Sequence, residues 1–160
     1  MKWTLFFISL ILVITISGFL FADPQLPKTI KHPKSNCIVE VSGGEYPSYV
    51  VKKNGKAIYS PTSDGIGKAF FSPSGEYIAF SGSEINWVDI EDKAFSIVVL
   101  KCSSGELKGF EKGYPGIDTK WVDNMTLKYN DTASGKEITV KIIPKANNSF
   151  QLTEHTPPGY

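Results

Sequence analysis

The stretch KAFFSPSGEYIAFSG, from Lys68 to Gly82, decides the fold class. Proline presets φ at about −65° and glycine accepts a positive φ, so Pro73 and Gly75 together suit a tight reversal of the chain. The flanking segments are rich in aromatic and β-branched residues, which fit a pleated, half-buried surface. The stretch therefore predicts two strands joined by a tight turn, and its plainest interpretation is a core hairpin.

The second strand of this hairpin has apolar side chains on both faces. Successive side chains of a strand alternate between faces, which places Tyr77 and Ala79 on one face and Ile78 and Phe80 on the other. We therefore expect this strand in the interior of a sheet that is covered on both sides. A later aliphatic run, IVVL at residues 97–100, predicts the same environment.

Further strands are predicted along the rest of the chain. Asn54-Gly55 between two short β-rich runs is the strongest hairpin signal in the sequence. Residues 120–129 predict another hairpin, and residues 136–142 alternate as a strand with one face in water. In all, about eight short strands with turn signals about every 8 to 12 residues predict an all-β fold: an antiparallel sandwich, a small barrel or blade-like sheets.

Residues 71–80, FSPSGEYIAF, resemble the opening of a blade in the TolB-type, WD-repeat-like β-propellers. Those repeats read F-S-P-D-G-x-x-I-A-F, followed by an aliphatic strand and a T-G-E-like turn. Here the later parts are similar to residues 95–100 and 103–106, and residues 120–129 give a weaker echo. One departure is Ser74, where the repeat usually has aspartate. The resemblance covers about half of the chain and implies blade-like sheets that serve as a protein-binding platform.

The length of the chain limits this resemblance. A propeller needs about four to eight blades of about 40 residues or more, and 160 residues predict one domain. By that repeat length the exported part holds about three blades at most. The chain either borrows only the blade pattern or closes a ring by oligomerising, and we favour the first interpretation.

An apolar run at the N-terminus predicts export. It extends from Leu5 to Ala22 after a short start that carries Lys2, which is typical of a signal peptide over residues 1–22. About 18 apolar residues also suffice for an uncleaved membrane anchor; we favour the cleaved signal. Either interpretation predicts a periplasmic or secreted domain, with membrane contact only through this run if it remains.

The remainder divides into three parts by composition. Residues 23–35 mix prolines with lysine and histidine, which predicts an extended linker or a first edge strand. Residues 36–144 are expected to form a single β domain. Residues 145–160 are polar and end in Pro-Pro-Gly-Tyr, which predicts a flexible tail.

The two cysteines, Cys37 and Cys102, predict one disulfide bond in an oxidising compartment. Both occupy strand-like positions, so we expect the bond to connect the first strand to the fifth or sixth. A redox or metal pair is the alternative, although the sequence has no C-x-x-C spacing and no histidine or aspartate in ligand spacing.

Charge and catalytic groups argue against several classes of function. The 17 basic and 16 acidic residues nearly balance, whereas nucleic-acid binding needs a basic footprint. The two histidines, His32 and His155, lie in the terminal segments, so a histidine-based nucleophilic mechanism is not expected. No cofactor or metal motif is present, and we predict a protein that is not an enzyme.

Exposed aromatic residues near loops are the candidate partner-binding residues. Trp87 lies beside polar Asn86, and Tyr114 lies in the loop sequence EKGYPG. Asp89 is a polar candidate in the same region as Trp87, within an acidic turn that we expect to be solvated. Aromatic residues dominate binding hot spots, so these residues predict a module that binds an envelope or extracellular protein.

A second class of function is compatible with the same features. Small secreted inhibitors of cell-wall hydrolases are often compact, disulfide-linked β domains that insert one loop into the enzyme cleft. Residues 61–67 and 111–116 are the candidate inhibitory loops.

Overall fold

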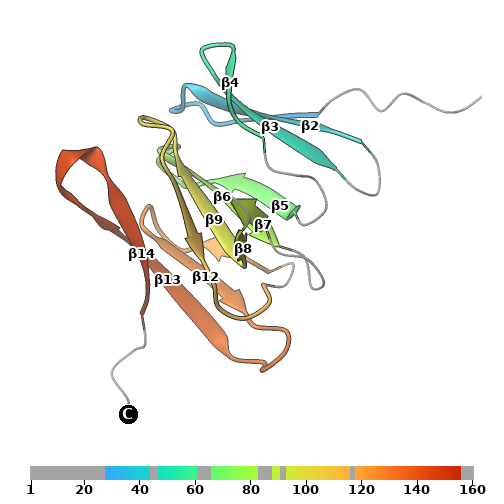
Figure 1. The fold of residues 1–160 in the computed structure, drawn as a ribbon, viewed down its shortest axis with the longest axis vertical. Coiled ribbons are helices and arrows are strands. Elements are labelled where there is room, and N and C mark those ends of the chain that lie inside the picture. The colour runs from blue at the N-terminus through green and yellow to red at the C-terminus, as the bar shows by residue number, and fades with distance from the viewer. Residues whose placement is uncertain are drawn as a thin grey trace, which may run out of the picture.

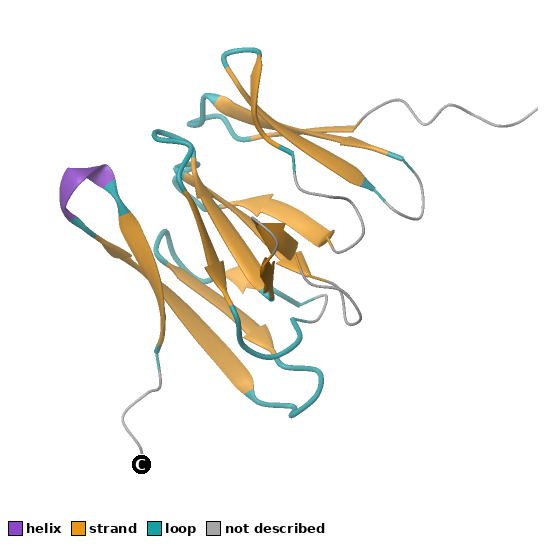
Figure 2. Cartoon of the chain, in the orientation of Figure 1, coloured by secondary structure: helices purple, strands orange, loops and turns teal. Residues whose placement is uncertain are grey.

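The structure, a computed structural model, describes residues 28–43, 47–60, 66–82, 88–90, 93–115 and 118–155. These ranges contain fourteen strands and one short 3₁₀ turn, η2 (Ala146–Asn148). Figure 2 shows this turn in purple among the orange strands. The all-β, antiparallel class is therefore confirmed, but the expected number of about eight strands is too low. No sheet closes into a barrel in the described part of the chain.

Twelve of the strands form three four-stranded antiparallel sheets, each a meander in chain order. The first sheet contains β1 (Lys28–Lys31), β2 (Cys37–Ser42), β3 (Ser48–Lys53) and β4 (Lys56–Tyr59). The second sheet contains β5 (Ile66–Phe71), β6 (Tyr77–Gly82), β9 (Ile97–Lys101) and β10 (Leu107–Phe110). The third sheet contains β11 (Lys120–Trp121), β12 (Thr126–Asn130), β13 (Glu137–Pro144) and β14 (Phe150–Glu154). The remaining two strands, β7 (Val88–Ile90) and β8 (Lys93–Phe95), form a hairpin inserted between β6 and β9.

The sheets are stacked face to face in the order of the chain, with the second sheet in the middle (Figure 1). Two hydrophobic cores follow from this arrangement. One lies between the first and second sheets, and the other lies between the second and third sheets. The chain therefore forms a stack of three sheets.

The middle strands confirm the prediction of burial on both faces. Ile78 and Phe80 of β6 belong to the core against the first sheet, whereas Tyr77 and Ala79 belong to the core against the third sheet. All five residues of β9 are buried, and its four apolar residues divide between the two cores in the same alternating way. Each fully buried apolar side chain contributes about 1.5–3 kcal/mol, so the middle sheet concentrates the stabilising burial.

Turn chemistry fixes the register at the predicted hairpins. Asn54 and Gly55 connect β3 to β4 and both have positive φ, 51° and 80°, as a two-residue hairpin turn requires. Gly75, with φ 74°, connects β5 to β6. A Cβ at Gly75 would lie 2.3 Å from the His32 ring, so this turn needs glycine both for its backbone and for the close approach of the neighbouring sheet.

The outer faces of the stack carry charged side chains. On the first sheet, Lys52 and Glu40 form a cross-strand ion pair with an N–O distance of 2.7 Å. On the third sheet, Lys128 and Lys141 alternate with the buried residues of their strands and so point away from the core. The end layers therefore resemble the polar capping units of stacked repeat proteins.

The C-terminal segment differs from the predicted flexible tail. Residues 150–154 form β14, which pairs with β13, and Phe150 is fully buried in the core between the second and third sheets. This strand was not predicted because its pattern is short: only two large apolar residues, Phe150 and Leu152, alternate with polar residues there. Similarly, the expected linker contains β1, which pairs with β2 and so realises the edge-strand alternative.

The second and third sheets are also joined by polar contacts at one end. Lys101 of β9 is 5% exposed, and its ammonium group donates to the carbonyl oxygen and the Oδ1 atom of Asn148, at 3.0 and 2.6 Å. Next to it, Ser149 Oγ donates to Glu106 at 2.6 Å. This bond, together with Lys108, holds the pKa of the Glu106 carboxyl below its usual range. The η2 turn is thus fastened to the end of the second sheet.

Candidate functional site

The loop that carries Tyr114 is anchored at successive backbone positions, and residues 111–115 are called the Tyr114 loop here. The Tyr129 hydroxyl donates to the Lys112 carbonyl, and Ser96 Oγ donates to the Gly113 carbonyl at 2.7 Å. The Tyr114 N–H donates to Asp131 Oδ1 at 2.8 Å, and its carbonyl accepts from the Thr132 N–H at 3.0 Å. The backbone of this loop is therefore held in one conformation, while Tyr114 as a residue remains 38% exposed.

Asp131 is the main anchor of the Tyr114 loop. Its carboxylate accepts hydrogen bonds from the hydroxyl and backbone N–H of Ser134, and from the backbone N–H groups of Tyr114 and Ala133. These donors, with the Ser134 hydroxyl first among them, lower the pKa of the Asp131 carboxyl. A carboxylate that accepts several hydrogen bonds favours its charged form, so the anchor is ionised at neutral pH.

We expect Asp131→Asn to lower the melting temperature at pH 7 because the amide offers one acceptor atom where the carboxylate offers two. A carboxyl whose pKa is lower in the folded state stabilises the fold above its ordinary pKa of about 3.9. That stabilisation is lost as the pH falls through the lowered value. The difference between wild type and variant should therefore shrink when thermal unfolding, followed by circular dichroism, is repeated below about pH 4.

Asp123→Asn is the matched control because Asp123 also accepts a backbone hydrogen bond, from Met125 at 2.7 Å, but at an exposed turn. It should change the melting temperature less. A gap between wild type and Asp131→Asn that stays constant from pH 7 to pH 3 would contradict the role of the Asp131 charge.

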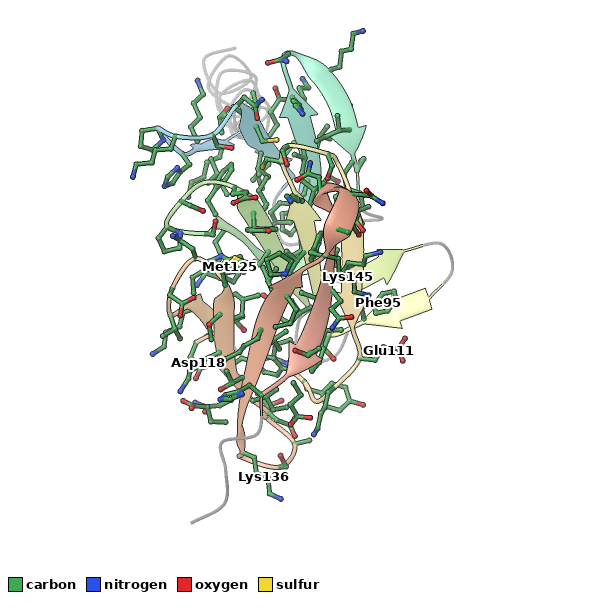
Figure 3. The ribbon with its side chains drawn as sticks, turned by 90° about the vertical axis from the view of Figure 1, so that its left-hand side faces the viewer. Phe95, Glu111, Asp118, Met125, Lys136 and Lys145 are labelled. Atoms are coloured by element: carbon green, nitrogen blue, oxygen red, sulfur yellow. The ribbon has the colours of Figure 1, made fainter. Side chains whose placement is uncertain are left out.

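The β7–β8 hairpin leaves the stack beside the Tyr114 loop. Figure 3 shows the hairpin extending away from the sheets, with Phe95 at its base and Glu111 close below. A Cβ at Gly109 of β10 would lie 2.1 Å from the Phe95 ring, so the ring occupies the space that a side chain would fill. Ser96, the next residue, donates its backbone N–H to Phe110 and its hydroxyl to Gly113. The base of the hairpin is therefore hydrogen-bonded both to β10 and to the Tyr114 loop.

The structure describes two of the three predicted partner-binding residues, Tyr114 and Asp89. Tyr114 lies at the exposed position expected for it. Asp89 lies in β7, where its backbone pairs with Ala94 of β8. Trp87 lies outside the described residues, as do most of the candidate loop 61–67 and two members of the acidic turn, Glu91 and Asp92.

Sequence reasoning missed the residues that hold this surface together. Asp131 begins the sequence DTASGK, in which an aspartate before serine and glycine is typical of a turn capped by the aspartate side chain. That signal indicates the local hydrogen bonds to Ala133 and Ser134. The contact with Tyr114 depends on the pairing of distant segments, which no local pattern reveals.

A second feature is a hollow of about 380 Å³ at the end of the first and second sheets. It is lined by three turns: residues 34–36 before β2, residues 74–76 before β6, and Cys102 and Ser103 after β9. Lys34 and Glu76 give it opposite charges, and serine side chains provide most of its other polar groups. The hollow is therefore suited to a small polar group rather than to an apolar one.

Cys37 and Cys102 are brought together beside this hollow as two buried free thiols. The Cys37 thiol donates to the carbonyl oxygen of Cys102 with an S–O distance of 3.8 Å. The structure thus places the predicted disulfide partners next to each other across the first and second sheets, without a bond between them.

No protein family and no curated protein matches this chain. Within the described ranges, no group of three or more histidine, cysteine, aspartate or glutamate side chains is placed to hold a metal ion. The same ranges contain no helix that is long and apolar enough to cross a membrane. The Tyr114 loop, with the β7–β8 hairpin beside it, is the candidate binding site of the chain.

Proposed function

We propose that this chain is a protein-binding module that acts outside the cytoplasm. Its binding surface consists of the Tyr114 loop and the β7–β8 hairpin, and its partner is an envelope or extracellular protein. The blade-like order of the three meander sheets supports this proposal, because repeats of the TolB and WD type serve mostly as protein-binding platforms. The apolar N-terminal run supports the location.

The observation that carries the proposal is an exposed tyrosine on an immobilised loop. Tyrosine supplies a large amphipathic contact area at a small cost in side-chain entropy. A loop that already has its bound conformation avoids the ordering cost of association. Because the backbone of residues 112–114 is hydrogen-bonded to Tyr129, Ser96 and Asp131, most of this cost is met when the chain folds.

We expect Tyr114→Ala to weaken partner binding by about thirtyfold or more, the effect of removing an aromatic hot spot. The full chain, its variant and a Val122→Ala control are used to capture partners from an envelope extract. The captured protein is identified by mass spectrometry, and its affinity is measured by surface plasmon resonance. Val122 is 52% exposed at the end of β11, and its replacement should change the affinity by about twofold at most.

Circular dichroism of Tyr114→Ala should match that of wild type, so that a loss of binding reports on the surface and not on folding. If the partner binds wild type and Tyr114→Ala equally, the proposed surface is wrong. If wild type captures no partner, the proposal of a binding module fails.

Inhibition of a cell-wall hydrolase is the second candidate function. The anchored Tyr114 loop favours it, because a loop that occupies an enzyme cleft must stay rigid to avoid being bound as a flexible substrate. If the captured partner is a hydrolase, its activity should fall as the full chain is added and recover with Tyr114→Ala. Unchanged hydrolase activity in the bound state would leave the binding module as the better description.

A further inference from the structure

The two cysteines differ in their access to solvent, although they touch each other. Cys37 begins β2 and is fully buried, whereas Cys102 follows β9, is 3% exposed and lines the hollow. Ser35 also lines the hollow and contacts both cysteines. Its hydroxyl donates to Cys102 Sγ at 3.5 Å and accepts from the Cys37 N–H at 3.2 Å. A reagent that enters the hollow therefore reaches the sulfur of Cys102 before that of Cys37.

We propose that Cys102 is a thiol-modification site, which reacts with disulfide-bearing oxidants from the hollow and passes the oxidation on to Cys37. In the first step Cys102 loses its proton to solvent and its sulfur attacks one sulfur of the oxidant R–S–S–R. The S–S bond of the oxidant breaks, a mixed disulfide forms at Cys102, and one thiolate RS⁻ leaves. In the second step Cys37 loses its proton and attacks the Cys102 sulfur, which releases the second RS⁻. Two thiols are thereby oxidised to one disulfide, and the oxidant is reduced to two thiols.

The size and polarity of the hollow suit this role. Its volume of about 380 Å³ accommodates part of a peptide or glutathione chain. The opposite charges of Lys34 and Glu76 and the hydroxyl groups of the lining serines match the carboxylate, ammonium and amide groups of such a chain. The ligand class is therefore a small peptide-like disulfide, or an extended segment of a protein that carries one.

The environment of Cys102 sets how fast the first step proceeds. Burial raises the pKa of the Cys102 thiol to about 12, and contact with the Cys37 thiol adds to this rise. The thiolate is the attacking species, so only a small fraction of the protein is reactive at neutral pH. The rate should rise by about tenfold for each pH unit over the range in which the thiol remains protonated.

The test uses the reduced full chain and glutathione disulfide as the probe. Samples are quenched with acid, remaining thiols are alkylated, and the position of each adduct is mapped by mass spectrometry. Wild type should show a glutathione adduct at Cys102, followed by an internal disulfide between Cys37 and Cys102. Cys37→Ser should accumulate the adduct at Cys102, and Cys102→Ser should leave Cys37 unreacted while the protein is folded.

Access through the hollow is tested with a matched pair of bulky substitutions. Ser103→Trp fills the hollow and should slow adduct formation by about tenfold or more, whereas Ser104→Trp, one residue outside it, should leave the rate within about twofold. If circular dichroism shows that a variant fails to fold, the order in which adducts form on wild type still tests the proposal. An adduct that appears first at Cys37, or thiols that react only after urea is added, would overturn the proposal.

Discussion

Phe80→Ala should lower the free energy of unfolding by about 4 kcal/mol, as other phenylalanine truncations in packed cores do. Phe80 is fully buried in the core between the first and second sheets. Its ring contacts Tyr59 and Tyr49 edge to face, with centroid distances of 5.3 and 6.4 Å. The substitution removes both aromatic contacts and leaves a cavity between two sheets that cannot close around it.

The size of this effect is large for a chain of this length, since a typical domain is stable by only about 5–15 kcal/mol. Urea unfolding followed by circular dichroism gives the change, and an unchanged slope with urea shows that the comparison is valid. Val122→Ala, at an exposed position, should stay within about 0.5 kcal/mol of wild type. A loss below about 1.5 kcal/mol for Phe80→Ala would mean that the first and second sheets are not packed as described.

Lys101→Ala should lower the free energy of unfolding by about 3 kcal/mol, because two hydrogen bonds from a charged donor are lost together with the packing of the buried Lys101 side chain. The Asn148 carbonyl and Oδ1 both accept from the Lys101 ammonium, and η2 has no other contact of this kind to the end of β9 among the described hydrogen bonds. Glu76 is the charge partner at 3.6 Å, and its side chain is largely in solvent. The lost hydrogen bonds are therefore expected to matter more than the lost ion pair.

Two further variants separate these contributions in the same urea experiment. Lys101→Met keeps an unbranched apolar side chain at this buried position but removes the ammonium, which lies 5.9 Å from the centroid of the Tyr77 ring, so it should lose less stability than Lys101→Ala. Lys108→Ala removes an exposed ion pair with Glu106 and should cost about 0–1 kcal/mol. If Lys101→Met is more stable than wild type, the cost of burying the ammonium exceeds the value of its hydrogen bonds, and the expected role of Lys101 is wrong.

The sequence predicted those parts of the fold in which local chemistry and burial agree. The turn around Gly75, the reversal at Asn54-Gly55 and the double-sided burial of β6 and β9 all occur as expected. The number of strands was underestimated because β14 lies in the expected tail, β1 lies in the segment expected to be a linker or an edge strand, and β7 and β8 have only three residues each. Such short strands are specified by their partners more than by their own pattern.

For the candidate site, the exposure of Tyr114 could be predicted from the sequence, but its contacts could not. Tyr114 follows glycine and precedes proline, so an exposed loop could be predicted from the sequence. Its immobilisation by Asp131 and Ser96 could not, because those residues are 17 and 18 positions away and meet the loop only after the sheets have stacked. The adjacency of Cys37 and Cys102 was predicted from their number and from the expected compartment. The hollow beside Cys102 could not be predicted, because it is formed by three turns that are far apart in the sequence.

The alternation of side chains in β6 and β9 determines how a change in the packing of one outer sheet affects the other outer sheet. These two strands supply residues to both cores, and the residues of the first and third sheets belong to separate cores. The other two strands of the middle sheet, β5 and β10, also contribute to both cores, so a change in the packing of the first sheet reaches the third sheet by displacing the backbone of the middle sheet. Substitutions in the two outer sheets are energetically independent to the extent that this backbone is rigid, and their effects add. The middle sheet thus separates the two cores, and a ligand that binds one outer sheet should leave the packing of the other outer sheet unchanged.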